Sequence, residues 1–304
     1  MHDTIPLFRV PSQSDRLPPF SVSEVSTLSA SFAEDVDAYA RAGVDGIGVW
    51  ETKLGDGPDD EALALLAASG LGSASAVPAV PSILPLPLLP GPDDPRARVD
   101  ALCASVHRLA AFAPSGVVCV TGPAGGRDPE AARALVVDGL REVGAEAERA
   151  GVRMALEPFQ REGVEAWSLV NTISEAVELI EETGSPAIGL QFDVWHLWNT
   201  PDLLAEIERE AHRFVGVHVG DWREPTRGWA DRVLPGDGVA PLPEILGALE
   251  TAGWAGYYDL EIFSDNGAFG SAYPDSLWDV EPVELVSRAR RGFVRCWQER
   301  RVAA

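Results

Sequence analysis

The feature that most constrains the fold of this sequence is a repeated alternation of short apolar runs with longer amphipathic stretches. The apolar runs are rich in Val and Ile or bounded by Gly, which is typical of buried strands. We expect eight strands, at residues 21–28, 46–50, 73–80, 116–122, 152–158, 187–193, 214–220 and 257–263.

The amphipathic stretches between these runs predict helices. Several begin on Ser, Asp or Thr and end on Gly, the residues that cap helix termini. The expected ranges are 31–43, 59–70, 94–112, 128–151, 172–184, 201–210, 241–253 and 282–300. Since no flexible linker divides the chain, we predict an α/β protein with a single (β/α)₈ TIM barrel over residues 1–304. A doubly wound open sheet is the alternative, but no Gly-rich phosphate loop follows the first strand.

The charge of the chain argues against some classes of partner. The 304 residues include 47 acids and 24 bases, which give a formal net charge of −23. A phosphate backbone is bound largely through Lys and Arg, so we expect no nucleic-acid partner. The sequence shows neither a secretory leader pattern nor an uncharged apolar window long enough to span a membrane, so we expect a cytoplasmic protein.

One segment interrupts the alternation of strands and helices. Residues 78–95 contain seven prolines and several leucines between the third strand and its helix. This composition does not favour a helix, and the segment is long for a connection. It is either an apolar flap over the strand ends or an extended loop with a purely structural role.

Polar residues occur at the carboxyl ends of four consecutive strands, where the active site of such a barrel lies. They are Glu157, Asp193, His218 and Glu261. Three buried carboxylates repel one another unless a cation lies between them, so the pattern predicts a divalent metal. Three carboxylates and one imidazole suit Mn²⁺ best, with Mg²⁺ or Co²⁺ as alternatives.

These motifs resemble the sugar phosphate isomerase/epimerase superfamily, whose members are xylose isomerase-like TIM barrels. The resemblance runs from residue 34 to the last helix and depends on LEP around Glu157, FDVWH at 192–196, VHVGD at 217–221, GDG at 236–238 and DLEIF at 259–263. It implies that the four strand-end residues hold the metal. It also implies that Glu157 and Glu261 act as the acid/base pair on opposite faces of a keto sugar, through an enediolate.

Further residues are candidates for contacting the substrate. The resemblance implies that His196 reaches substrate oxygens, and that an Arg follows the seventh strand, with Arg223 first and Arg227 second. Gln160 and Glu51 follow strand ends and could line the pocket or be structural. Indoles gather at strand ends too, Trp195 among them, and they stack well on sugars and aromatic rings. The indoles concerned are Trp50, Trp195, Trp198, Trp222, Trp229 and Trp278.

We therefore predict an enzyme, a metal-dependent sugar isomerase or epimerase. The first alternative is a metal-dependent lyase that cleaves 3-keto-glycosides with an aromatic or sugar aglycone by β-elimination. A non-catalytic sugar-binding barrel is a weaker alternative. Apurinic endonucleases share the superfamily, but their metal clusters need more histidines than the five present here. The expected partner is a small sugar or glycoside, with a homo-oligomer or a small partner subunit as further possibilities.

Overall fold

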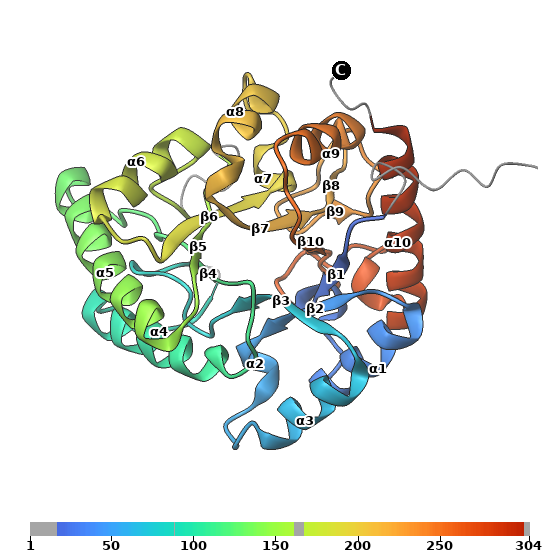
Figure 1. Cartoon of the computed structure of the whole chain (residues 1–304), viewed down its shortest axis with the longest axis horizontal. Helices are drawn as coiled ribbons and strands as arrows, with labels where there is room; N and C mark the ends of the chain where they lie inside the picture. Colours follow the sequence, from blue (N-terminus) through green and yellow to red (C-terminus); the bar gives the residue numbers. More distant parts are fainter. Residues whose placement is uncertain (1–16, 88, 161–166, 301–304) are drawn as a thin grey trace, which may run out of the picture.

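The computed structural model describes residues 17–87, 89–160 and 167–300, and eight parallel strands in it form a closed barrel. Helices surround the barrel on its outside (Figure 1). The expected (β/α)₈ fold is confirmed. The barrel strands are β1 (Phe20–Ser23), β2 (Gly46–Trp50), β3 (Gly72–Val77), β4 (Gly116–Cys119), β5 (Met154–Leu156), β6 (Ile188–Asp193), β7 (Phe214–Val219) and β10 (Tyr258–Leu260).

Within the described residues, eight helices of at least two turns connect these strands or close the ring. They are α1 (Phe32–Ala42), α3 (Asp60–Ser69), α4 (Pro95–Ala110), α5 (Pro129–Ala150), α6 (Ile173–Thr183), α8 (Leu203–Glu210), α9 (Leu242–Thr251) and α10 (Pro282–Glu299). Several of the predicted caps are present, although Asp59 forms no side-chain capping bond at the start of α3. Ser31 and Glu34 form a capping box at the start of α1, and Gly43 ends it with a φ of 71°. No helix in the described ranges is long and apolar enough to cross a membrane.

The first strand is shorter than expected. We predicted residues 21–28, but β1 ends at Ser23 and the chain continues as a 3-10 helix, η2 (Glu24–Thr27). Side chains of this turn hydrogen-bond to neighbouring strands, because the Glu24 carboxylate accepts from the backbone N–H of Trp50 and the Ser26 hydroxyl donates to the carbonyl of Leu260. The remaining short helices are α2 (Glu51–Leu54), α7 (Val194–Leu197), η3 (Ala211–Arg213) and η4 (Leu277–Asp279).

The register of the strands brings the predicted polar residues to one level. Asp193 pairs with His218 across β6 and β7. Glu157 and Glu261 lie one residue beyond the ends of β5 and β10, and their backbone N–H groups extend the ladder by donating to Cys119 and Val219. Because all these strands are parallel, the four side chains lie at the same carboxyl end of the barrel.

One feature near that end, the following ribbon, was not expected from the sequence. An antiparallel ribbon of β8 (Asp221–Trp222) and β9 (Arg232–Val233) follows β7. The Pro-rich segment 78–95 runs beside the extension of β4, where Ile83 donates to the carbonyl of Val120. The buried guanidinium of Arg98 donates to the carbonyl and hydroxyl oxygens of Ser82. The segment is thus both an apolar cover for the strand ends and a part of the packed structure.

Candidate active site

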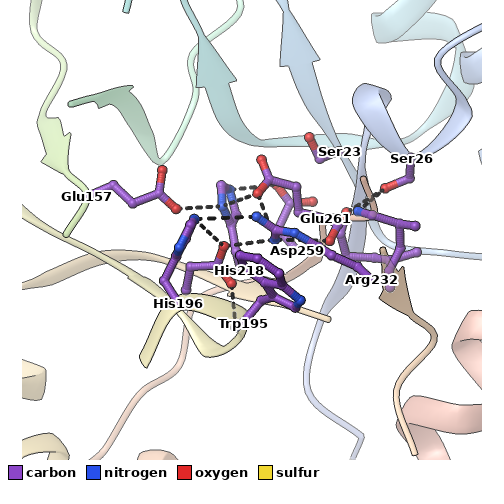
Figure 2. A network of polar contacts seen from close by, with 12 residues as sticks. Ser23, Ser26, Glu157, Trp195, His196, His218, Arg232, Asp259 and Glu261 are labelled. Carbon is purple, nitrogen blue, oxygen red and sulfur yellow. Dashed lines mark hydrogen bonds and ion pairs between the residues drawn. The ribbon is translucent and has the colours of Figure 1, made fainter. Parts of the chain in front are cut away.

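The four strand-end residues Glu157, Asp193, His218 and Glu261 form one cluster, called here the four-residue cluster. All four are buried, and one potential ligand atom from each lies within 4.8 Å of the others. Figure 2 shows Glu157 and Glu261 converging on His218. Nδ1 of His218 lies 3.5 Å from an oxygen of Glu157 and 3.4 Å from one of Glu261. The structure therefore brings together the residues that the sequence predicted as a metal site.

Burial and mutual repulsion set the pKa values of the three carboxylates. Burial raises the pKa of Glu157 to about 7. Burial also raises the pKa of Asp193, against the opposing effect of Arg232. Burial alone would raise the pKa of Glu261 as well, but His218 and Arg232 together hold it below the usual value. The site thus contains carboxyl groups that differ in proton affinity, as acid/base chemistry requires.

The imidazole of His218 lies between carboxylates on both of its edges. On the edge opposite Glu157 and Glu261, Nε2 lies 3.9 Å from the carboxylate of Asp259. The hydroxyls of Ser21 and Ser75 donate to that carboxylate, at 2.8 and 2.5 Å. Burial disfavours a charged imidazole, yet the neighbouring carboxylates hold the pKa of His218 well above its usual value. Asp259 thus favours a proton on Nε2 and leaves Nδ1 directed at the four-residue cluster.

The four-residue cluster fits a divalent metal. An oxygen of Glu157 and Nδ1 of His218 are buried without a hydrogen-bond partner, although both belong to strongly polar groups. Carboxylate oxygens with one imidazole nitrogen are suitable donors for a divalent ion, and the ion would compensate the acidic charge. These residues could therefore hold one metal ion at the carboxyl end of the barrel.

Arg232 is a buried residue of this site that the sequence analysis missed. Its Nη1 donates to Asp193 at 2.8 Å and to Glu261 at 3.1 Å. The guanidinium also lies over the ring of Trp195, 4.7 Å from its centroid. Arg232 thus neutralises part of the acidic charge and directs its donors toward the site. The sequence feature that points to Arg232 is its position in RVLPGDG, four residues before the GDG motif.

The GDG motif forms the turn that follows Arg232, and Asp221 holds it in place. The buried carboxylate of Asp221 accepts hydrogen bonds from the backbone N–H groups of Gly236, Gly238 and Ala240. A Cβ at Gly238 would lie 2.4 Å from an oxygen of Asp221, so glycine is required there. The turn is therefore fixed by hydrogen bonds from its backbone N–H groups to the Asp221 carboxylate.

Arg223 and Arg227, the arginines that we predicted to contact substrate, lie in a different place. Both form ion pairs with Asp231 and Asp275, and both are about one-third exposed. Neither lines the pocket next to the four-residue cluster. The ribbon is the physical reason for this difference. Arg223 and Arg227 lie in the loop between β8 and β9, and the chain returns to the site only at Arg232, where β9 begins. These two arginines tie that loop to the segment after β10.

His196 lies beside the four-residue cluster. Its Nε2 is 3.7 Å from Asp193, and its ring stacks on Phe159 at a centroid distance of 4.3 Å. The backbone N–H of Gln160 donates to Nδ1 at 3.4 Å, and Nη2 of Arg232, which can only donate, lies 3.5 Å from Nε2. Burial, reinforced by Arg232, holds the pKa of His196 well below its usual value, so the ring is neutral. A neutral His196 thus presents Nε2 to the site next to Arg232.

The other predicted pocket residues divide into two groups. Trp195 lines the pocket together with His196. Gln160 lies on the far side of the His196 ring, in a separate shallow depression. Glu51 is buried outside the pocket, where its carboxylate accepts from the backbone N–H of Ala79 and lies 3.5 Å from Arg108. The structure therefore gives Glu51 an anchoring position at the start of the Pro-rich segment.

A pocket opens above the four-residue cluster, and most of its wall is apolar. Of the indoles singled out in the sequence, Trp50, Trp195 and Trp229 line it, while Trp198 and Trp222 pack behind Trp195. The full lining consists of Trp50, Val77, Pro81, Leu86, Leu89, Val118, Val120, Glu157, Phe159, Trp167, Trp195, His196, Trp229, Arg232, Glu261 and Phe263. The reactive carboxylates thus lie at the base of an aromatic pocket.

Known proteins share this architecture. The D-psicose 3-epimerase of Enterocloster bolteae is 30% identical over 175 residues, which are 56% of this chain and 54% of that enzyme. The inosose dehydratase of Geobacillus thermodenitrificans is 27% identical over 146 residues, 43% of this chain and 47% of that enzyme. The chain thus spans about half the length of these relatives. Both are enzymes by name, which agrees with the prediction that this protein is an enzyme.

The structural and family comparisons extend over more of the chain. A crystal structure of a protein from Sinorhizobium meliloti 1021 has 28% identity and a TM-score of 0.79, and the match covers 91% of this chain and 98% of that one. The family model described as xylose isomerase-like TIM barrel matches residues 36–288. Since this model matches well over half of the sequence, the chain belongs to the xylose isomerase-like TIM barrel family.

Proposed function

We propose that this protein is a divalent-metal-dependent isomerase or epimerase of a keto sugar. The observation that carries the proposal is the convergence of Glu157 and Glu261 with Asp193 and His218 at the base of one pocket. Two carboxylates beside a metal site can remove a proton next to a carbonyl and return one to another face or carbon. The relation to a D-psicose 3-epimerase supports this reaction class.

We infer Mn²⁺ as the metal, with Mg²⁺ or Co²⁺ as alternatives, because the donors are three carboxylates and one imidazole. When bound, the ion supplies a Lewis acid that polarises the substrate carbonyl and stabilises negative charge on its oxygens.

The protein's own residues have separate roles in this proposal. Glu157 lies at the base of the pocket and accepts the proton from the carbon next to the carbonyl. Glu261 lies across the four-residue cluster and handles the proton on the other face. Arg232 donates hydrogen bonds to substrate oxygens, and Nε2 of neutral His196 forms a hydrogen bond with a substrate hydroxyl. The apolar wall excludes water from the exchanging proton.

Elimination by a lyase is the second candidate function. It starts with the same proton abstraction and differs only in the loss of a substituent from the neighbouring carbon. The relation to an inosose dehydratase supports it, because dehydration is an elimination. The four-residue cluster suits both outcomes, so the reaction product separates them.

The test is to incubate the Mn²⁺-loaded protein with free ketoses and with 3-keto-glycosides in D₂O. Deuterium on the carbon next to the carbonyl of an intact, rearranged sugar would support isomerase or epimerase activity. Release of the aglycone would favour the lyase instead. The Glu261→Gln variant should lose turnover, and a variant that keeps full activity would refute the proposed acid/base pair.

A further inference from the structure

We propose that the pocket above the four-residue cluster is a subsite for an uncharged aromatic substituent of the substrate. This inference rests on the proposed function for the position of the reacting carbonyl, and it holds for either epimerisation or elimination. The substrate class is then a hydroxy ketone that carries an aryl group, rather than a free or phosphorylated ketose.

The first observation is a continuous arc of aromatic rings around the pocket. Phe159 contacts Trp167 with ring centroids 6.2 Å apart, and Trp167 contacts Trp229 at 5.0 Å. Trp229 in turn contacts Phe263 at 5.7 Å, and Phe263 contacts Trp50 at 6.1 Å. Most of these pairs meet edge to face or at a tilt, so both faces and edges of rings point at the space between them. Such a surface is complementary to another aromatic ring.

The second observation is that aliphatic side chains complete the lining of the pocket. Leu86 and Leu89 of the Pro-rich segment 78–95 reach the pocket, together with Pro81. Leu89 and Trp229 are only partly buried, so apolar surface remains accessible at the mouth. Covering this surface with an apolar substituent is favourable, because apolar area is removed from water.

The third observation concerns hydrogen bonding. Apart from indole N–H groups, the polar side chains among the described lining residues are Glu157, His196, Arg232 and Glu261, which lie close together near the reacting groups (Figure 2). A free ketose that extended its hydroxyls along the wall would lose water contacts without gaining partners, which costs free energy for each hydroxyl. An aryl group has no hydroxyls to desolvate.

The fourth observation concerns charge. Arg232 is the one basic side chain among the described lining residues, and its guanidinium is paired with Asp193 and Glu261. Among the residues that the structure describes, a phosphate at the mouth would find no unpaired cation and would face a site rich in carboxylates. The described lining therefore disfavours a phosphorylated substrate.

The test compares ligands that differ only in the substituent. Isothermal titration of the full-length Mn²⁺-loaded protein with phenyl and methyl β-D-glucopyranoside measures binding without turnover, because neither contains a ketone. We expect phenyl β-D-glucopyranoside to bind at least about tenfold more tightly, since one buried ring removes a large apolar area from water. Equal affinity, or a preference for the methyl glycoside, would overturn the subsite.

Variants locate the preference in the pocket. Trp229→Ala and Leu89→Asn should each reduce the ratio of the two affinities toward one, and Leu89 is partly exposed on a loop, which limits the effect on folding. Trp254→Phe is the matched control, because Trp254 follows α9 away from this pocket. An undiminished ratio in both pocket variants would refute the assignment.

The outcome is separable from that of the proposed function. In D₂O, phenyl and methyl 3-keto-β-D-glucopyranoside report on the reaction, and deuterium uptake from the phenyl compound should show the higher kcat/KM. A phenyl preference in binding without deuterium uptake from any ketone would support the subsite and refute the proposed reaction. Deuterium uptake with equal kcat/KM for the phenyl and methyl compounds would support the proposed reaction and refute the subsite.

Discussion

The carboxylate of Asp259 lies 3.9 Å from Nε2 of His218, on the ring edge opposite Glu157 and Glu261. A histidine that binds a metal through one nitrogen commonly donates its other N–H to a carboxylate, which fixes the ring and increases its basicity. The hydroxyls of Ser21 and Ser75 orient this carboxylate. Asp259 is therefore a positioning residue for the proposed metal site.

Asp259→Asn should weaken Mn²⁺ binding by about tenfold or more, because the amide neither attracts nor orients the Nε2–H as a carboxylate does. Metal titration monitored by calorimetry measures the change. Ser21→Ala is the control, since it removes one hydrogen bond to Asp259 and should have a smaller effect. Unchanged Mn²⁺ affinity in Asp259→Asn would contradict the role.

Metal binding should weaken as the pH falls below about 7. The pKa of Glu157 is raised to about 7, and the pKa of His218 is also raised, so protons compete with the metal for both. Because both folded-state pKa values are raised, these two groups stabilise the metal-free protein at low pH and lose that contribution as the pH rises. The increase in Tm caused by Mn²⁺ should therefore shrink between about pH 8 and about pH 6. A constant increase would contradict the assignment of these ligands.

Arg232→Met should lower the stability of the metal-free protein by about 3 to 5 kcal/mol, because it leaves Asp193 and Glu261 buried without their cation. Urea unfolding measures this free energy. Mn²⁺ should restore part of this lost stability, since the ion neutralises the same carboxylates. The activity of the variant should stay below about 1% of wild type, because a hydrogen-bond donor to the substrate is missing. Arg223→Met is the control and should lose little activity; the opposite ranking of the two variants would refute the role of Arg232.

Asp221→Asn should destabilise the protein by about 3 kcal/mol, because the carboxylate accepts backbone hydrogen bonds from Trp222, Gly236, Gly238 and Ala240. An amide keeps one acceptor oxygen and places an N–H₂ group against other donors. Asp237→Asn in the same turn is exposed and should change the unfolding free energy by less than about 0.5 kcal/mol. Equal effects would show that Asp221 does not hold the turn.

Much of the barrel could be predicted from the sequence, because local patterns specify it. β2 spans the predicted residues 46–50, and α1 lies within its predicted range and has the expected caps. The predicted strand at 21–28 was too long because long-range hydrogen bonds of Glu24 and Ser26 bend the chain into a 3-10 turn. No local pattern reveals bonds between residues that are far apart in the sequence.

The candidate site shows the same limit. Glu157 and Asp193 could be found because strand ends meet at one edge of a barrel, whatever the connecting loops do. Arg232 could not be predicted from its separation from His218 along the sequence. A loop that is held by ion pairs of Asp231 lies between the two residues. Glu51 follows a strand like the others, yet the backbone N–H of Ala79 orients its carboxylate away from the pocket.

The loop between β8 and β9 carries Trp229 of the aromatic arc, and it leads directly into Arg232, the first residue of β9, which contacts the four-residue cluster. A change of substrate preference made through this loop would therefore disturb the chemistry along with the recognition. Leu86 and Leu89 contact the same pocket from a segment held independently by Arg98. Adapting this enzyme to a differently shaped substituent should start at those two leucines, where recognition can be varied while the reaction is conserved.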